Sequence, residues 1–78
     1  MAIRAFILIE TAVGKGHQVV TALRLIKGIS SADLVTGPYD VVAIVEAPDL
    51  NALGAMVLRQ IQSSSGVART LTCLITSI

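Results

Sequence analysis

Hydrophobic residues in this chain occur in short runs, and their spacing alternates between the period of a β-strand and that of an α-helix. This pattern predicts six elements in the order strand, helix, strand, strand, helix, strand. Glycines and short polar stretches separate them, as expected for connecting turns. The predicted strands span residues 2–11, 30–36, 40–47 and 67–78, and the predicted helices span residues 16–27 and 49–62.

The two middle strands are joined by the turn sequence Gly37-Pro38-Tyr39-Asp40. Glycine frees the backbone, proline fixes φ and lacks an N–H donor, and aspartate can hydrogen-bond its own main chain, so the chain should reverse direction here. The apolar runs on either side are rich in β-branched residues, which predicts a β-hairpin. Tyr39 and Asp40 are the polar side chains of this hairpin that we expect to take part in recognition or chemistry.

The first and third predicted strands are apolar on both faces. Residues 5–9 and 41–45 are uninterrupted apolar runs, a pattern typical of strands buried on two sides. The element order is that of a ferredoxin-like α+β fold, βαββαβ, and right-handed crossovers place both helices on one face of its antiparallel sheet. Because the other face would be bare, we predict that two copies pack sheet to sheet, as in a dimeric α+β barrel.

The second predicted helix begins with Asp49, which can cap its N-terminus. We expect its core-facing stripe to consist of Leu50, Leu53, Gly54, Val57, Leu58 and Ile61. Its outer face would then carry Ala52, Ala55 and Met56 beside few polar residues. A face of this kind is less polar than that of a solvated helix, so we expect the dimers to associate further.

The composition is unusually apolar for so short a chain. Of the 78 residues, 54% are hydrophobic and only 14% are charged, and the mean hydropathy is +0.81. A single copy has too small a core to bury all of this surface. A membrane-spanning helix needs about twenty consecutive apolar residues, and the runs here are far shorter, so self-association accounts better for the excess. The N-terminus lacks a signal-peptide pattern, so we expect a cytoplasmic protein.

Charge and metal-binding residue types exclude several classes of function. Six basic and five acidic residues give a net charge of +1 and are scattered singly, so the chain has no basic patch for nucleic acid or anionic lipid. Cys73 is the only cysteine and His17 the only histidine, and neither has a second ligand at metal-binding spacing. We therefore expect no metal, no cofactor and no catalytic residues.

Two sequence motifs carry a resemblance to a known family. The first is Val-Thr-Gly-Pro-Tyr-Asp at residues 35–40, and the second is Gly-Val-Ala-Arg-Thr-Leu-Thr at residues 66–72. The sequence Glu-Ala-Pro-Asp-Leu at residues 46–50 extends the match, which covers nearly the whole chain. On these residues the chain resembles the effector-binding (RAM) domain of the Lrp/AsnC family, the feast/famine transcriptional regulators.

The resemblance implies a function and a site. In that family the domain forms dimers through its sheet, dimers assemble into octamers or decamers, and amino-acid effectors bind between adjoining dimers. By position, Gly37, Tyr39 and Asp40 would form one wall of the effector site, and Thr70 and Thr72 would form the other. A carboxylate can bind the ammonium group of an amino acid, and hydroxyl groups can bind its carboxylate, so these residue types suit such a ligand.

Full-length members of the family begin with a helix-turn-helix DNA-binding domain, whereas this chain begins at its first strand. We therefore expect residues 1–78 to form one stand-alone sensing domain without direct nucleic-acid contact, which could join a full-length relative. Residues 29–33 are Ile-Ser-Ser-Ala-Asp, where the family usually has a proline and an acidic residue, so the effector stays unnamed. Two alternatives remain: an ACT-type regulatory module, and a small dimeric α+β barrel enzyme such as a cofactor-free monooxygenase or isomerase. The strands are short of the polar side chains that such catalysis needs.

Overall fold

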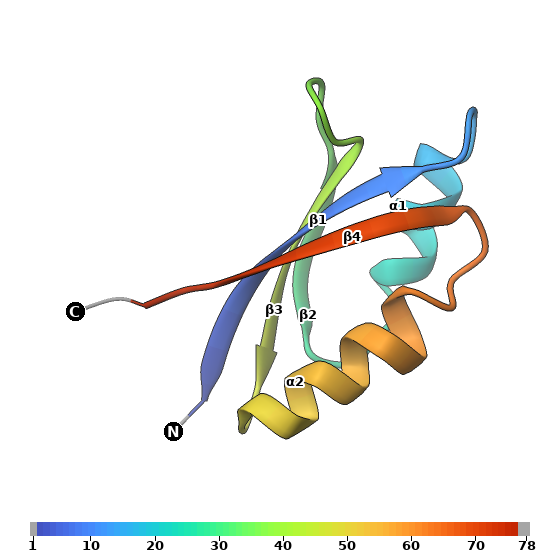
Figure 1. Ribbon diagram of the computed structural model, residues 1–78. Coiled ribbons are helices and arrows are strands. Elements are labelled where there is room, and N and C mark those ends of the chain that lie inside the picture. Colours follow the sequence, from blue (N-terminus) through green and yellow to red (C-terminus); the bar gives the residue numbers. More distant parts are fainter. Residues whose placement is uncertain (1, 77–78) are drawn as a thin grey trace.

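The computed structural model describes residues 2–76 and contains the six predicted elements in the predicted order (Figure 1). A short segment of wider π-helical geometry, η1, continues the second helix. The last predicted strand ends earlier than expected, and its predicted residues 77 and 78 lie outside the described residues. The elements are β1 (Ile3–Thr11), α1 (Gly16–Leu23), β2 (Ile29–Leu34), β3 (Val41–Ala47), α2 (Leu50–Met56), η1 (Val57–Ile61) and β4 (Val67–Leu74).

The strands form one antiparallel sheet in the order β2-β3-β1-β4. Strands β1 and β3 are therefore central, and β2 and β4 are the two edges. Both helices lie on the same side of the sheet (Figure 1). This is the split βαβ topology in which each crossover helix packs on one face. The prediction of a ferredoxin-like α+β fold is confirmed.

The core lies between the sheet and the helices. Successive side chains of a strand point to opposite faces, and alternate residues of β1 and β3 are buried beneath the helices. No polar or charged side chain of residues 2–76 is buried, so this core is held by apolar packing. Its largest fully buried side chains are Ile7, Ile9, Val19, Leu23, Val41, Val45, Leu53 and Ile61.

The opposite side of the sheet is also apolar. Phe6 pairs with Ile44 and Cys73 across the strands, and Leu8 pairs with Val42 and Leu71. Because paired residues share a face, these side chains form one surface away from the helices. We call it the open face, and it consists of Phe6, Leu8, Val42, Ile44, Leu71 and Cys73. Phe6 is 40% exposed and Leu71 is 47% exposed, which confirms that the central strands are apolar on both faces.

Helix α1 is shorter than its apolar spacing predicts. It ends at Leu23, and the following residues make tight turns in which Leu25 N–H donates to Ala22 O at 3.2 Å and Ile26 N–H donates to Leu23 O at 3.0 Å. Ile26 nevertheless packs against the core. Its helical spacing therefore reflects a buried position in a turn, and the predicted end at residue 27 is wrong.

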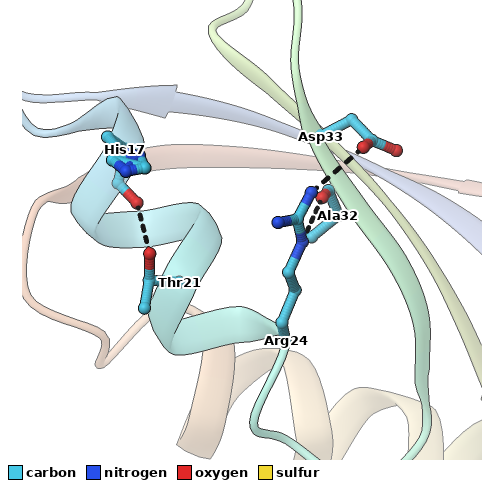
Figure 2. A network of polar contacts seen from close by, with 5 residues as sticks. All are labelled: His17, Thr21, Arg24, Ala32 and Asp33. Carbon is cyan, nitrogen blue, oxygen red and sulfur yellow. Dashed lines mark hydrogen bonds and ion pairs between the residues drawn. The ribbon is translucent and has the colours of Figure 1, made fainter.

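The end of α1 is fastened to β2 by one side chain. Arg24 Nε donates to Ala32 O at 3.0 Å, and Arg24 Nη2 lies 3.2 Å from Asp33 Oδ1 (Figure 2). At the start of the helix, Thr21 Oγ1 donates to His17 O at 3.0 Å, and the His17 side chain is exposed. These Arg24 contacts join the end of α1 to the edge strand β2.

Helix α2 begins as predicted. Asp49 precedes it in an extended conformation, and its Oδ1 accepts a hydrogen bond from Ala52 N–H at 2.8 Å. This satisfies one of the free N–H groups of the first turn. The buried side chains that follow are Leu53, Val57 and Ile61, spaced by four residues. In η1 the Gln62 N–H donates to Val57 O at 2.8 Å, a five-residue step that widens the turn.

The predicted core stripe of this helix is partly wrong. Leu50 is 61% exposed and Leu58 is 65% exposed, whereas Ala52 and Met56 pack against the core. Compared with the prediction, the helix is rotated about its axis so that Met56 faces the core. Gly28 makes room for this side chain, because its φ is +98° and a Cβ there would lie 2.5 Å from Met56 Cε. Met56 therefore fills the space that this glycine leaves open, and the other flank of the helix faces outward.

Candidate functional site

Three of the predicted site residues, Gly37, Tyr39 and Asp40, lie in the turn between β2 and β3. Gly37 has a φ of +144°, a conformation that favours glycine, and a Cβ added there would meet no atom within 4 Å. Tyr39 is half-buried. The tip of the hairpin is therefore open to a second molecule, while its base is anchored to the sheet.

Asp40 supplies that anchor. Its Oδ2 accepts hydrogen bonds from Thr11 N–H at 2.8 Å and from Thr11 Oγ1 at 3.2 Å, and its own N–H donates to Ile9 O at 2.9 Å. Thr11 is the last residue of β1, and Asp40 comes directly before β3, the strand that pairs with β1. The carboxylate thus binds the end of β1 rather than its own turn, and within residues 2–76 its Oδ1 has no hydrogen-bond partner.

The other two predicted residues, Thr70 and Thr72, lie on the edge strand β4. Thr70 pairs with Ile9 and Thr72 pairs with Ile7, so both threonines point to the helix side of the sheet. They are nevertheless not buried, because α2 and η1 do not cover the edge strand fully. Gln62 Nε2 donates to Thr70 Oγ1 at 2.9 Å. Sequence reasoning missed this contact, because a glutamine at the end of a helix has the pattern of an ordinary exposed residue.

Two hollows lie along β4 on this side. The first has a volume of about 310 Å³ and is lined by Gln62, Val67, Ala68, Arg69 and Thr70. The second has a volume of about 340 Å³, is almost wholly apolar, and is lined by Leu50, Leu53, Gly54, Val57, Leu58, Thr72 and Leu74. The two predicted threonines therefore line different hollows, Thr70 the polar one and Thr72 the apolar one.

The hairpin residues and the threonines are separated within one copy. Val41 pairs with Ile9, and Ile9 pairs with Thr70, so the turn and Thr70 lie at the same end of the sheet with β1 between them. Two strand spacings amount to about 10 Å. The structure brings Gly37, Tyr39 and Asp40 together and brings Thr70 and Thr72 together, but it does not join the two groups into one pocket.

An ion pair lies at the same end of the sheet. Arg69 Nη2 lies 2.7 Å from Glu10 Oε2, and these two residues are register partners next to Leu8 and Leu71 on the open face. Both side chains reach solvent, so in one copy the pair contributes no more than about 1 kcal/mol. It marks a polar rim on an otherwise apolar surface.

Metal binding and membrane crossing are two further roles that residues 2–76 can be compared with. No group of three histidine, cysteine or acidic side chains in that range is placed to hold a metal ion. No helix there has the length and apolar character needed to cross a membrane. Cys73 is a free, exposed thiol on the open face.

Two solved structures share this fold over nearly the whole length of both chains. TTHA0845 from Thermus thermophilus is 34% identical with a TM-score of 0.91, and the match covers 97% of this chain and 95% of that one. The hypothetical protein PHS023 from Pyrococcus horikoshii is 29% identical with a TM-score of 0.89, covering 100% and 93%. No curated protein sequence matches this chain.

A longer regulator contains the same fold. The transcriptional regulator NMB0573 from Neisseria meningitidis, solved as its L-Met complex, is 21% identical with a TM-score of 0.87, and the match covers 96% of this chain and 50% of that protein. The model of the family described as the Lrp/AsnC ligand binding domain matches residues 4–78. The chain therefore belongs to the Lrp/AsnC ligand-binding domain family.

Proposed function

We propose that this domain senses an amino acid or a closely related small molecule, which binds where two dimers adjoin. The observation that carries the proposal is the division of the predicted site into two accessible groups that lie on opposite sides of β1 within one copy. A second copy can bring its Gly37, Tyr39 and Asp40 opposite Thr70 and Thr72. NMB0573, which shares the fold, was solved in complex with L-Met, and this supports the ligand class.

The dimer in this proposal forms through the open face. Phe6 and Leu71 are large, apolar and partly exposed there, and contiguous exposed apolar surface favours association. Dimers then assemble into octamers or decamers. The proposed sensing unit is the cytoplasmic domain formed by residues 1–78, which makes no direct contact with nucleic acid.

The proposed output is regulatory. A ligand that binds only where two dimers meet has a higher affinity for the assembled state, and it therefore shifts the population toward that state. A full-length Lrp/AsnC regulator is the partner through which such a shift would reach transcription. No reaction is assigned to the domain.

A thermal-shift screen with the twenty amino acids tests the sensing role, with light scattering on the same samples. A ligand at one hundred times its Kd stabilises the folded state by about 2.7 kcal/mol, which corresponds to roughly 10–20 °C in the melting temperature of a domain of this size. We expect at least one amino acid to raise the melting temperature and to change the assembly. A protein that responds to none of the twenty contradicts the proposal.

Substitutions of Asp40 test its assigned role. Asp40→Ala removes the acceptor of both Thr11 hydrogen bonds and should cost about 1–3 kcal/mol of folding free energy. Asp40→Asn keeps an acceptor oxygen and removes the charge, so it should lower amino-acid affinity at least roughly tenfold with less loss of stability. Calorimetry measures the affinity and urea unfolding measures the stability.

Thr11→Val is the matched control for Asp40. It removes the hydroxyl bond to Oδ2 and leaves Oδ1 untouched, so it should lower stability slightly and leave affinity unchanged. If Asp40→Asn binds the effector as tightly as the natural protein, Asp40 is a structural anchor and not a ligand contact.

A further inference from the structure

The outer edge of β2 carries backbone groups that the sheet leaves unpaired. Val35 N–H donates to Asp40 O at 2.9 Å, which makes these two residues a hydrogen-bonded pair that continues the β2–β3 ladder. Hydrogen-bonded and non-hydrogen-bonded pairs alternate along an antiparallel ladder, so Leu34 and Ala32 belong to the second kind. Their N–H and C=O groups point away from β3, and such an edge offers donors and acceptors to a further strand.

One of these groups is occupied by a side chain from the helix layer. Arg24 directly follows α1, and its Nε donates to Ala32 O at 3.0 Å while its Nη2 lies 3.2 Å from Asp33 Oδ1 (Figure 2). Ala32 is buried on the helix side of the sheet, whereas Asp33 pairs with Val42 of the open face. The guanidinium group therefore spans the edge of β2 between the two faces.

The contact with Ala32 lies in the middle of the regular part of β2. A register shift between Ile29 and Ser31 disturbs the first residues of the strand. An added antiparallel strand would use both the N–H and the C=O of Ala32, because the residues of a hydrogen-bonded pair exchange two bonds. Arg24 already occupies this carbonyl, and a charged group over a strand edge opposes pairing.

The other edge of the sheet has no such cover. Ile75 N–H donates to Arg4 O at 2.9 Å, so by the same alternation Thr70, Thr72 and Leu74 point their backbone groups outward from β4. Among residues 2–76, the side chains that hydrogen-bond to β4 contact its side chains and not its backbone. The edge beside the proposed ligand site is therefore open, and the cover is specific to β2.

We propose that Arg24 guards the edge of β2 and keeps it from pairing with β2 of a second copy. Two like edges can pair antiparallel about a two-fold axis, since Ala32 placed opposite Ala32 would exchange two identical hydrogen bonds. Such pairing would join two assemblies through a surface distinct from the open face. The guard confines self-association to the other surfaces of the domain, and this inference does not depend on the proposed ligand.

The charge-neutral double variant Arg24→Ala/Asp33→Ala tests the guard. The two side chains are 58% and 67% exposed, so their removal should leave the domain folded, as urea unfolding can verify. Light scattering should show at least roughly twice as many chains per assembly as in the natural protein, because uncovered strand edges pair. Amide hydrogen exchange at Ala32 and Leu34 should slow at least roughly tenfold, since both N–H groups would then be hydrogen-bonded.

Arg24→Lys is a milder second variant. It keeps the charge and Asp33, but a single ammonium group lacks the planar fork that holds the Ala32 carbonyl and the Asp33 carboxylate together. It should show the same two changes to a smaller extent.

Lys27→Ala/Glu46→Ala is the matched control. It also removes one basic and one acidic residue, and neither side chain forms an ion pair within residues 2–76. It should assemble and exchange as the natural protein does, and if it grows like the Arg24 variants, loss of charge and not of the guard is the cause. The guard is also overturned if Arg24→Ala/Asp33→Ala keeps the natural number of chains, or if Ala32 and Leu34 exchange rapidly in its larger assemblies. Protection of these two amides in the natural protein would show that the edge is already paired and would overturn it too.

Discussion

The two faces of the sheet are built from the same strands and are similarly apolar, but only one is covered. In β1, Ile7 and Ile9 are fully buried beneath the helices, whereas Phe6, next to Ile7 in sequence, is 40% exposed on the open face. Alternation along the strand makes both faces equally suited to packing. One copy therefore leaves the open face uncovered, and this is the face that the proposed dimer would bury.

The covered face is itself uneven. Above β1 and β3 the alternate side chains are buried, but above the edge strand β4 the same face holds the accessible Thr70 and Thr72. Helix α2 turns Ala52 and Met56 toward the core and leaves its leucine flank overhanging β4. The candidate site therefore lies where the helix layer ends, at the border between the covered and uncovered parts of the sheet.

The strongest test of this comparison is Phe6→Glu. In a sheet-to-sheet dimer the substitution places two unpaired carboxylates in one apolar interface, which costs several kcal/mol per dimer. We expect dimers to be lost at micromolar concentration, as measured by analytical ultracentrifugation. Dimers that persist in this variant would show that the open face is not the interface.

Ile7→Ala and Phe6→Ala compare the two faces directly. Ile7 is fully buried within one copy, so its truncation should lower the unfolding free energy by about 2–5 kcal/mol at every protein concentration. The effect of Phe6→Ala should depend on protein concentration, because the proposed dimer would bury the part of that side chain that one copy leaves exposed. Urea unfolding at several concentrations separates the two cases.

Arg69→Ala has the smallest expected effect and locates the edge of the interface. In one copy its exposed ion pair with Glu10 is worth about 0.2–1 kcal/mol. A double-mutant cycle with Glu10→Ala, read by urea unfolding, measures the coupling between the two charges. A coupling within that range places the pair at a solvated rim, and a much larger one places it inside the dimer contact.

Several local features could be predicted because each depends on neighbouring residues. The Asp49 cap, the hairpin turn at residues 37–40 and the two-sided apolar character of β1 and β3 follow from side-chain chemistry and periodicity over short stretches. Strand β4 shows the same alternation, with Thr70 and Thr72 on one face and Leu71 and Cys73 on the other.

The errors arise where distant segments compete. At the end of α1, Arg24 contacts the distant strand β2, and beside α2, Met56 occupies the space next to Gly28. Helical spacing is compatible with more than one buried stripe when leucine, alanine and methionine occupy adjacent flanks. Only the shape of the surface beneath the helix selects between them.

The sequence by itself determined the order of the elements, the presence of a second apolar sheet face and the family motifs at residues 35–40 and 66–72. The tertiary structure alone decided that Asp40 binds Thr11, that Gln62 binds Thr70 and that the leucine flank of α2 forms a groove with β4. The physical reason is range: propensity and periodicity act along the chain, whereas these contacts join residues that only the packed sheet and helices bring together.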